Sequence, residues 1–309
     1  MPQDQENYSS DPDVRRLAII NAIELDKETA LRLILSGFDD TDGAVREEAA
    51  RAIADIPGEY MLLPLLKLLE DSDENVRIAA AETLSECNIK ELGDIYEEWI
   101  TNKCDFVRSS VLRALRPLRI PGVALYALKG LNDLSQAVRL ESVGVLGYLQ
   151  NSAYAHDLSK VAVNDVSPEV RRIAVGAIGY ALTPETLAAA LQGLHDNEWQ
   201  VRAEAAGTMA KLGADGVCGE VVVAMSAETQ WQVISKLLVA IGKIKCHDAV
   251  LEVAEMLTHP VSNVRKEAAM CLGEIGNPVA IASLRTALLD RDPDVKKVAA
   301  WAIAKLQAI

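Results

Sequence analysis

The sequence predicts an all-α protein built from about ten stacked two-helix repeats. Three observations lead to this fold. A Val-Arg pair returns every 31 or 32 residues, each pair opens a segment with the apolar spacing of an amphipathic helix, and a second amphipathic segment precedes it. Self-similarity at this period is typical of a solenoid, in which each repeat contacts only its neighbours.

The Val-Arg pairs mark one helix of each repeat. The residues four, eight and eleven positions after Val are mostly apolar and share one face of a 3.6-residue helix, so each helix should bury one stripe. The pairs are Val14-Arg15, Val45-Arg46, Val76-Arg77, Val107-Arg108, Val138-Arg139, Val170-Arg171, Val201-Arg202 and Val264-Arg265, with Val233-Ile234 and Val295-Lys296 in the two remaining places. Segments such as 59–71 and 183–196 provide the other helix. We expect about 19 helices and no strands.

Asp recurs five residues before Val, in the turn that leads into the helix. It is present as Asp40, Asp71, Asp133, Asp165, Asp196 and Asp290. We expect this Asp to cap a helix, and the Arg after Val to bridge the carboxylates of adjoining turns, which forms a structural ladder along the array. Ser167-Pro168, Thr183-Pro184 and Asp292-Pro293 each predict an N-cap followed by Pro at the first helical position.

This D-x-x-x-x-V-R pattern, followed by Ala-Ala and then Leu-Gly, resembles the short HEAT-like repeats of the phycobilisome-lyase type. The resemblance covers nearly all of residues 11–307. It implies a right-handed α-α superhelix of about ten 31-residue repeats, with the Val-Arg helices lining the concave side. Such arrays serve many tasks, so the resemblance indicates the fold more strongly than the function.

We expect residues 1–10 to be a flexible N-terminus and 11–309 to be a single solenoid domain with an acidic part at 11–100. Two places are irregular, near 105–120 and 215–245. Pro117 falls inside the Val107 helix and should end or kink it. In the second place Ile234 replaces the ladder Arg and Glu228 replaces the Asp. Either place is a hinge or an ordinary variation of the repeat.

Charge is unevenly distributed along the chain, whose net charge is −14. Residues 1–100 hold 24 Asp and Glu against 9 Lys and Arg, whereas the remainder is close to neutral. An acidic surface repels phosphate backbones, so nucleic acid is disfavoured as a partner. Arg113, Arg116 and Arg119 form a local basic cluster that leaves a DNA-glycosylase-like role as a minor alternative. The acidic third is either a solvated face or a dock for a basic segment of a partner.

No apolar run approaches the roughly 20 residues of a membrane span, and we expect a cytoplasmic protein. The five cysteines, Cys87, Cys104, Cys218, Cys246 and Cys271, are scattered without CxxC spacing. In an intracellular chain this pattern predicts reduced thiols, with neither a disulfide nor a structural metal. His156, His195, His247 and His259 are not followed by Glu, which excludes the paired His-Glu iron ligands of HEAT-like hydroxylases.

The sequence therefore favours a non-catalytic scaffold or adaptor, monomeric and without a cofactor or metal, that holds a protein or peptide partner in a concave groove. The alternative is a phycobilin-lyase-like protein that handles a chromophore, which the resemblance implies without any motif for bilin chemistry. Nucleophile elbows, P-loops and HExxH motifs are absent from the sequence. No catalytic residue is predicted.

The groove is predicted from the residues six and ten positions after each Val. Gly144, Gly176 and Gly207 recur at the sixth position, and Tyr148 and Tyr180 stand at the tenth. Gly costs about 1 kcal/mol relative to Ala inside a helix, so the glycines indicate either closely packed helices or a floor approached by a ligand. The predicted binding residues are Glu82, Arg113, Glu141, Tyr148, Tyr180, Glu204 and Lys211.

Overall fold

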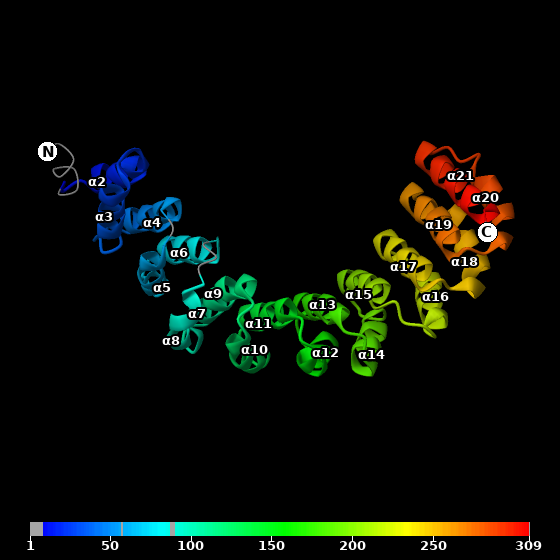
Figure 1. Ribbon diagram of the computed structural model, residues 1–309, viewed down its shortest axis with the longest axis horizontal. Helices are drawn as coiled ribbons and strands as arrows, with labels where there is room; N and C mark the ends of the chain where they lie inside the picture. Colours follow the sequence, from blue (N-terminus) through cyan, green and yellow to red (C-terminus); the bar gives the residue numbers. More distant parts are fainter. Residues whose placement is uncertain (1–8, 57, 87–89, 309) are drawn as a thin grey trace. The chain divides into compact units, whose positions relative to one another are not determined.

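The computed structural model describes residues 9–56, 58–86 and 90–308 (Figure 1). They form two compact units, one ending at Leu149 and the other beginning at Gln150. Most of the predicted flexible N-terminus, residues 1–8, lies outside the described residues. Each unit is a double layer of helices, and we call the layer whose helices begin near a Val-Arg pair the Val-Arg layer and the other the outer layer.

In the first unit, each Val-Arg helix packs against its counterparts in the neighbouring repeats and against the outer helix that precedes it. The Val-Arg layer contains α2 (Pro12–Ile20), α4 (Gly43–Ala52), α6 (Glu74–Glu86), α9 (Asp105–Leu115) and α11 (Gln136–Leu149). The outer layer contains α3 (Lys27–Gly37), α5 (Leu62–Leu68), α7 (Leu92–Ile95), α8 (Glu97–Ile100) and α10 (Ala124–Gly130).

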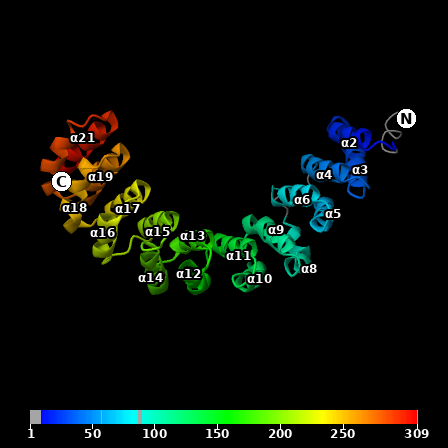
Figure 2. The same cartoon turned by 180° about the vertical axis from the view of Figure 1, so that it is seen from behind.

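The second unit repeats this arrangement (Figures 1 and 2). Its Val-Arg layer contains α13 (Pro168–Ala177), α15 (Trp199–Leu212), α17 (Trp231–Ile244), α19 (Ser262–Ile275) and α21 (Pro293–Gln307). Its outer layer contains α12 (Ala155–Asn164), α14 (Pro184–Gly193), α16 (Cys218–Ala227), α18 (Val250–Glu255) and α20 (Ile281–Ala287).

Short 3-10 turns extend or introduce many of these helices. They are η1 (Asn21–Glu24), η2 (Ile53–Asp55), η3 (Glu59–Met61), η4 (Arg116–Leu118), η5 (Pro121–Val123), η6 (Ser152–Tyr154), η7 (Ile178–Tyr180), η8 (His247–Ala249), η9 (Met256–Thr258) and η10 (Pro278–Ala280). The described residues contain no strand, and α7 and α8, separated by Tyr96 alone, together fill the place of one outer helix. The all-α repeat architecture predicted from the sequence is confirmed.

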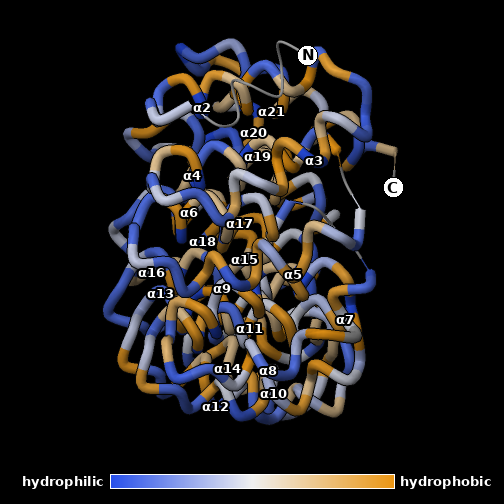
Figure 3. The backbone as a smooth tube through the Cα atoms, turned by 90° about the vertical axis from the view of Figure 1, so that its left-hand side faces the viewer, coloured by the Kyte–Doolittle hydropathy of each residue, from blue (hydrophilic) through white to orange (hydrophobic). Residues whose placement is uncertain are grey.

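The helices form because their apolar residues lie on one face, which the neighbouring repeats cover. In α4, Val45 and Ala49 are buried, as is Ile53 in the turn that follows, and this is the predicted spacing of 0, 4 and 8. Hydrophilic and hydrophobic residues accordingly alternate along the backbone trace (Figure 3). The predicted caps are also confirmed, since Ser167, Thr183 and Asp292 each accept a backbone N–H at a helix start that carries Pro.

The ladder connects neighbouring repeats through two-pronged ion pairs. In each pair the Nε and Nη2 groups of one Arg donate to both carboxylate oxygens of the residue in the following turn, with a shortest N–O distance between 2.6 and 2.9 Å. The pairs are Arg15–Asp40, Arg46–Asp71, Arg108–Asp133, Arg171–Asp196, Arg202–Glu228 and Arg265–Asp290.

The same guanidinium also holds its own turn. Nη1 of Arg46 donates to the backbone oxygen of Asp40 at 2.7 Å, and Nη1 of Arg202 donates to that of Asp196 at 2.8 Å. Each ladder Arg therefore ties the turn before its helix to the turn of the next repeat. Because the side chains of these pairs are largely buried, the planar guanidinium fork is well suited to the position.

The ladder carboxylate does not cap the helix, which corrects one expectation. Asp40 accepts the N–H of Asp42 at 2.8 Å, and it is Asp42 that caps α4 through the N–H of Ala44. The turn position therefore has two separable roles, a local bond to the residue two positions on and an ion pair to the previous repeat.

Asn and His at the turn position of two repeats keep the local hydrogen bond without the ion pair. Asn102 accepts the N–H of Cys104 at 2.8 Å and so keeps the turn, but an amide cannot form an ion pair with Arg77. His259 likewise accepts the N–H of Val261 through Nδ1 at 3.1 Å. No ladder Arg precedes His259, because buried Ile234 occupies that place in α17. Glu228 retains both roles despite its extra methylene, so it is a working replacement for Asp.

The first irregular place follows directly from Pro117. The α9 helix ends at Leu115, η4 follows, and Arg119 adopts the left-handed conformation with φ 52°. The break is therefore the predicted consequence of a proline inside a Val-Arg helix. A hinge at this place, a hinge near 215–245 and a single domain spanning 11–309 stay predictions.

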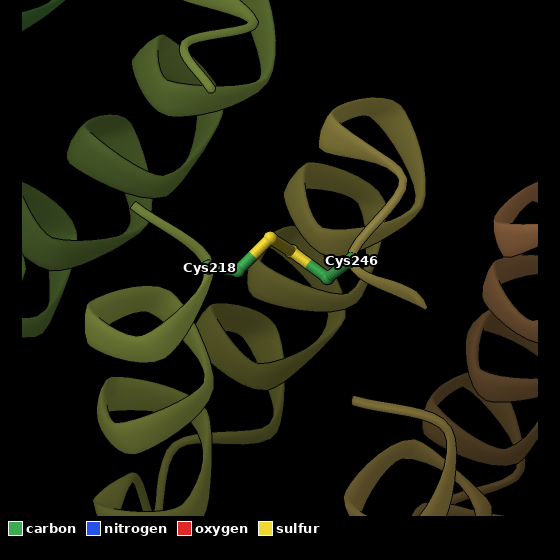
Figure 4. The surroundings of a disulfide bond; sticks show 2 residues. All are labelled: Cys218 and Cys246. Atoms are coloured by element: carbon green, nitrogen blue, oxygen red, sulfur yellow. A yellow bond between two sulfur atoms is a disulfide. The ribbon is translucent and has the colours of Figure 1, made fainter. Parts of the chain in front are cut away.

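A disulfide joins Cys218 and Cys246, which corrects the expectation of reduced thiols (Figure 4). Cys218 begins α16 and Cys246 follows α17, and stacking of these two helices brings the Cα atoms to 5.6 Å despite a separation of 28 residues. Sequence spacing could not indicate this proximity because it arises from helix packing. Among the described residues Cys104 is free and exposed and Cys271 is free and buried, where burial raises the pKa of its thiol. Cys87 lies outside the described residues.

Replacing Arg202 by Ala should lower the free energy of unfolding by about 1–3 kcal/mol, because Glu228 would remain buried without its partner. Arg77→Ala is the matched control, since Arg77 occupies the same place in its repeat but the turn of the next repeat carries Asn102 in place of an acid. Urea unfolding should show a smaller loss for Arg77→Ala. Equal losses for the two variants would contradict a stabilising role for the ion pair.

Acid should weaken the ladder. The hydrogen bond from Arg265 lowers the pKa of Asp290 to about 2, and the ladder Arg lowers the pKa of Asp40, Asp71 and Asp196 in the same way. An unfolded Asp has a pKa of about 3.9. Between that pH and the lower pKa of the folded protein, the unfolded chain therefore binds more protons than the folded chain. The stabilisation is complete above about pH 5 and is lost as the pH falls towards 2.

Urea unfolding of the wild type and of Arg265→Ala between pH 7 and pH 3 measures this effect. The difference in the free energy of unfolding between the two proteins should shrink as the pH falls. A difference that is the same at every pH would show that the charge of Asp290 does not contribute.

Reducing the Cys218–Cys246 disulfide should lower the free energy of unfolding by about 3 kcal/mol, because the bond closes a loop of 28 residues in the unfolded chain. Thermal unfolding with and without reductant measures the loss. The double variant Cys218→Ser, Cys246→Ser is the control and should not respond to reductant. Identical melting of the wild type under both conditions would show that the disulfide does not form in solution.

Candidate partner-binding surface

Three of the four predicted binding residues of the first unit, Arg113, Glu141 and Tyr148, come together in a compact cluster. Arg113 of α9 and Arg116 of η4 both reach Glu141 of α11, at 3.0 Å from Nε and 3.1 Å from Nη1 respectively. Glu141 is only 3% exposed. It therefore holds the two arginines from beneath, and as a buried residue it is not itself open to a partner as the sequence predicted.

Tyr148 lies beside these arginines near the end of α11. The guanidinium carbons of Arg116 and Arg119 stand 5.4 and 6.0 Å from the centre of its ring, within the range of a cation-π contact. Tyr148 is 44% exposed, so one side of the ring remains open to solvent. We call Arg113, Arg116, Arg119 and Tyr148 the Arg–Tyr cluster.

Gly144 is explained by the cluster itself. A Cβ atom at this position would stand 2.8 Å from Cδ of Arg116, so the arginine stem crosses the helix where the side chain is missing. The glycine permits Arg116 to reach both Glu141 and Tyr148. At this position the tight-packing interpretation of the sequence pattern is the better one.

Glu82 of α6 is exposed and belongs to a separate ionic network. It accepts from Nη1 of Arg51 at 3.4 Å, and Arg51 also pairs with Glu47 at 3.0 Å within α4. Exposed pairs of this kind contribute little to stability. Glu82 therefore remains accessible to a basic group, although the structure does not bring it into the Arg–Tyr cluster.

The predicted binding residues of the second unit already contact other groups of the protein. They are Tyr180, Glu204 and Lys211. Tyr180 donates its hydroxyl to the backbone oxygen of Asn151 at 2.7 Å, and burial raises the pKa of its phenol. Glu204 pairs with Lys211 at 3.9 Å. A Cβ atom on Gly176 would stand 2.7 Å from the Glu204 carboxylate, whereas Gly207 faces open space. Of the three glycines, Gly207 alone leaves space that a ligand could approach.

The sequence analysis missed an apolar stripe at the far end of the same row. Val239 of α17, Met270 of α19 and Trp301 of α21 are 40%, 37% and 40% exposed, and each stands six residues after its Val. These three residues are the apolar stripe. The row of sixth positions that contains Gly144, Gly176 and Gly207 continues into them, so extending that row by three repeats would have found the stripe.

Packing holds the stripe residues in place. A Cβ atom on Gly273 would meet the Trp301 indole at 2.7 Å, so the ring lies across α19 one turn beyond Met270. Lys305 stands 5.0 Å from the indole and also pairs with Glu274 at 3.0 Å. Between Val239 and Met270 is a hollow of about 180 Å³, lined further by Leu238, Gly242, Lys243, Glu267, Cys271 and Glu274. Its size suits one apolar side chain.

The first helix also exposes apolar side chains, for a different reason. Val14, Leu17, Ile20 and Ile23 are all exposed. No repeat precedes α2 among the described residues, so side chains that later repeats would cover remain uncovered. Their exposure therefore applies to the described residues and does not indicate a binding surface.

The chain matches the family of HEAT repeats over residues 6–85, 38–116, 155–221 and 220–304. Together these ranges cover most of its length. The chain belongs to the HEAT-repeat family. The HEAT repeats expected from the Val-Arg and Asp pattern are thereby confirmed, and the ladder and the double layer of helices are features of this HEAT array.

Solved structures support the same fold. The HEAT array is similar to an engineered protein with a TM-score of 0.57 and 19% identity, over 99% of this chain and 98% of that one. It is also similar to yeast importin-β, Kap95p, with a TM-score of 0.63 and 15% identity, but it spans only 48% of that protein. A further structure of Kap95p concerns its binding to RanGDP. At these identities the likeness shows the fold alone.

The CpcE–CpcF complex of phycocyanin lyase from a Nostoc species is similar over 59% of this chain and 76% of that one, with 20% identity and a TM-score of 0.46. A score at this level carries no argument about activity. No curated protein sequence matches the chain significantly. Within the part of the chain that the structure describes, no helix is long and apolar enough to cross a membrane. The same part holds no group of three or more side chains arranged to bind a metal.

Proposed function

We propose that this HEAT array is a non-catalytic scaffold that holds a protein or peptide partner on its Val-Arg layer. The apolar stripe carries the proposal. Trp and Met are enriched at the centres of protein interfaces, where burying them provides much of the binding free energy. Met270 and Trp301 are side chains of this kind, and with Val239 they form an apolar row on successive helices beside a hollow for one more apolar side chain, which suits an extended or helical segment of a partner.

The fold supports this proposal without identifying the partner. In an array of this kind every repeat presents one exposed helix face, so a long partner can contact several repeats at once. Kap95p, which has a similar fold over about half of its length, acts on the protein RanGDP. For the present chain, a protein partner is the corresponding proposal.

We further propose that a basic segment of the partner lies over the acidic first third of the chain. Exposed Glu82 is one of the groups available to it, since its contact with Arg51 is long and open to solvent. Residues 1–100 hold 24 acidic against 9 basic residues. The negative electrostatic potential of this region speeds the association of a basic segment, and salt screens it.

The test is capture of the partner followed by measurement of its affinity for variants of the stripe. The partner is identified by mass spectrometry after pull-down with the wild-type protein, and then purified. Met270→Glu should weaken its binding at least tenfold, because a charge would have to be buried in the hollow. Leu251→Glu on outer helix α18 is the matched control, since Leu251 is also exposed and apolar.

Unchanged affinity of Met270→Glu, with an intact helical spectrum, would remove the apolar stripe as the binding surface. A bilin whose absorption shifts when the purified protein is added would instead support the chromophore-handling alternative. The scaffold proposal expects no such shift.

A further inference from the structure

The chain changes its charge just before the middle, within the first unit. Residues 101–149 hold seven Lys and Arg against three Asp and Glu, whereas residues 1–100 are strongly acidic. Of the three acids, Asp133 is taken by the ladder residue Arg108 and Glu141 by Arg113 and Arg116. The Val-Arg layer therefore carries an excess of positive charge at α9, η4 and α11.

Arg119 is the arginine that this arrangement leaves available. Arg119 is exposed, and among the described residues it has no hydrogen-bonded or ion-paired partner. Its guanidinium makes a cation-π contact with the ring of Tyr148. Pro117 determines its place, because the proline ends the helix and the chain turns at Arg119 in the left-handed conformation. The fork of Arg119 thus projects beside Tyr148, where a regular helix would have continued.

Neighbouring groups hold the site in shape before any ligand binds. Arg113 and Arg116 are fixed from beneath by buried Glu141, and Arg116 lies over Gly144 beside the same tyrosine ring. Nε of Arg116 is buried and has no hydrogen-bond partner. One carboxylate therefore balances two of the three guanidinium groups, which leaves a net positive charge next to a half-exposed aromatic ring. Groups held in this way lose little conformational entropy on binding.

We propose that the Arg–Tyr cluster binds the side-chain carboxylate of an acidic peptide segment. Arg119 would donate two parallel hydrogen bonds to the carboxylate, which is the geometry that a guanidinium favours. The ring of Tyr148 would pack against the aliphatic part of the same side chain, and the exposed edge of Arg113 would add positive potential. This inference rests on the proposed function, because the acidic segment belongs to the protein partner.

A peptide fits better than a nucleic acid. The positive excess is confined to the few repeats around the cluster, and the same unit carries the acidic residues 1–100. A nucleic acid needs a row of cations along its phosphates, and its next phosphates would meet that acidic surface. One or two carboxylates on a flexible peptide need only the cluster.

The experiment measures the binding of a fluorescein-labelled decapeptide containing two glutamates by fluorescence anisotropy at low salt. Its counterpart with glutamines in those places is the matched probe. We expect the glutamate peptide to bind at least tenfold more tightly than the glutamine peptide. Arg119→Gln should weaken binding of the glutamate peptide about tenfold, and Arg119→Lys less, because Lys retains the charge but lacks the fork.

Lys129→Gln is the matched control. Lys129 also stands over a tyrosine ring, at 5.8 Å from the centre of Tyr126, but this pair belongs to outer helix α10. The change removes the same charge from the same unit and should alter affinity less than twofold. Equal binding of the two peptides, or equal losses for Arg119→Gln and Lys129→Gln, would overturn the proposal. Tighter binding of a 20-base-pair DNA duplex than of the glutamate peptide would also overturn it.

This result is separable from the test of the scaffold function. Arg119→Gln leaves the apolar stripe of the second unit unchanged, and Met270→Glu leaves the Arg–Tyr cluster unchanged. If Arg119→Gln has no effect on the peptide while Met270→Glu abolishes capture of the partner, the carboxylate site fails and the scaffold stands. If Arg119→Gln loses the peptide while Met270→Glu captures the partner normally, the carboxylate site stands and the apolar stripe fails.

Discussion

The ion pair between an Arg and the turn of the next repeat is the directional interaction that recurs along the array and sets how most neighbouring repeats stack. A helix pair of about 30 residues cannot bury its own apolar faces, so each repeat is stable only against its neighbours. The buried apolar face of α4 or α15 provides the burial, but apolar contact alone would permit sliding between helices. The guanidinium of Arg46 or Arg202 binds two turns with directional hydrogen bonds, and in this way fixes the register of one repeat on the next.

The repeats that lack a ladder ion pair show that the hydrogen bond within the turn and the ion pair between repeats are independent. At Asn102 and His259 the side chain still accepts the N–H two residues on, so the turn is kept where the ion pair is absent. At Ile234 an apolar side chain replaces the guanidinium and is buried. The repeat that lacks this Arg is also the one whose two helices are joined by the Cys218–Cys246 disulfide. A covalent link within the repeat is therefore present where a link to the next repeat is missing.

The exposed face of the Val-Arg layer consists of the helix positions that take no part in stacking. The sixth position after Val points away from the buried stripe, so stacking places little constraint on it. In the middle repeats it is Gly, which Arg116 covers at Gly144 and Glu204 covers at Gly176 and which is open at Gly207. In the last repeats it is Val239, Met270 and Trp301. In the first unit the exposed face is therefore ionic and aromatic around Tyr148. In the second unit it is apolar around Trp301.

The sequence by itself determined the repeat, its period, the buried positions of each helix, the residues of the ladder and the break at Pro117. These features depend on local spacing, which a 3.6-residue helix converts directly into faces. Only the tertiary structure decided which of the exposed groups are free. Glu141 is a conspicuous acid in the sequence, yet it is buried because two arginines from the preceding repeat converge on it. Tyr180 is bonded to the turn at Asn151, whereas Tyr148 stays half open. Cys218 and Cys246 meet only because two helices stack. Each of these outcomes depends on the distance between side chains of different helices, and no periodicity within one helix contains that distance.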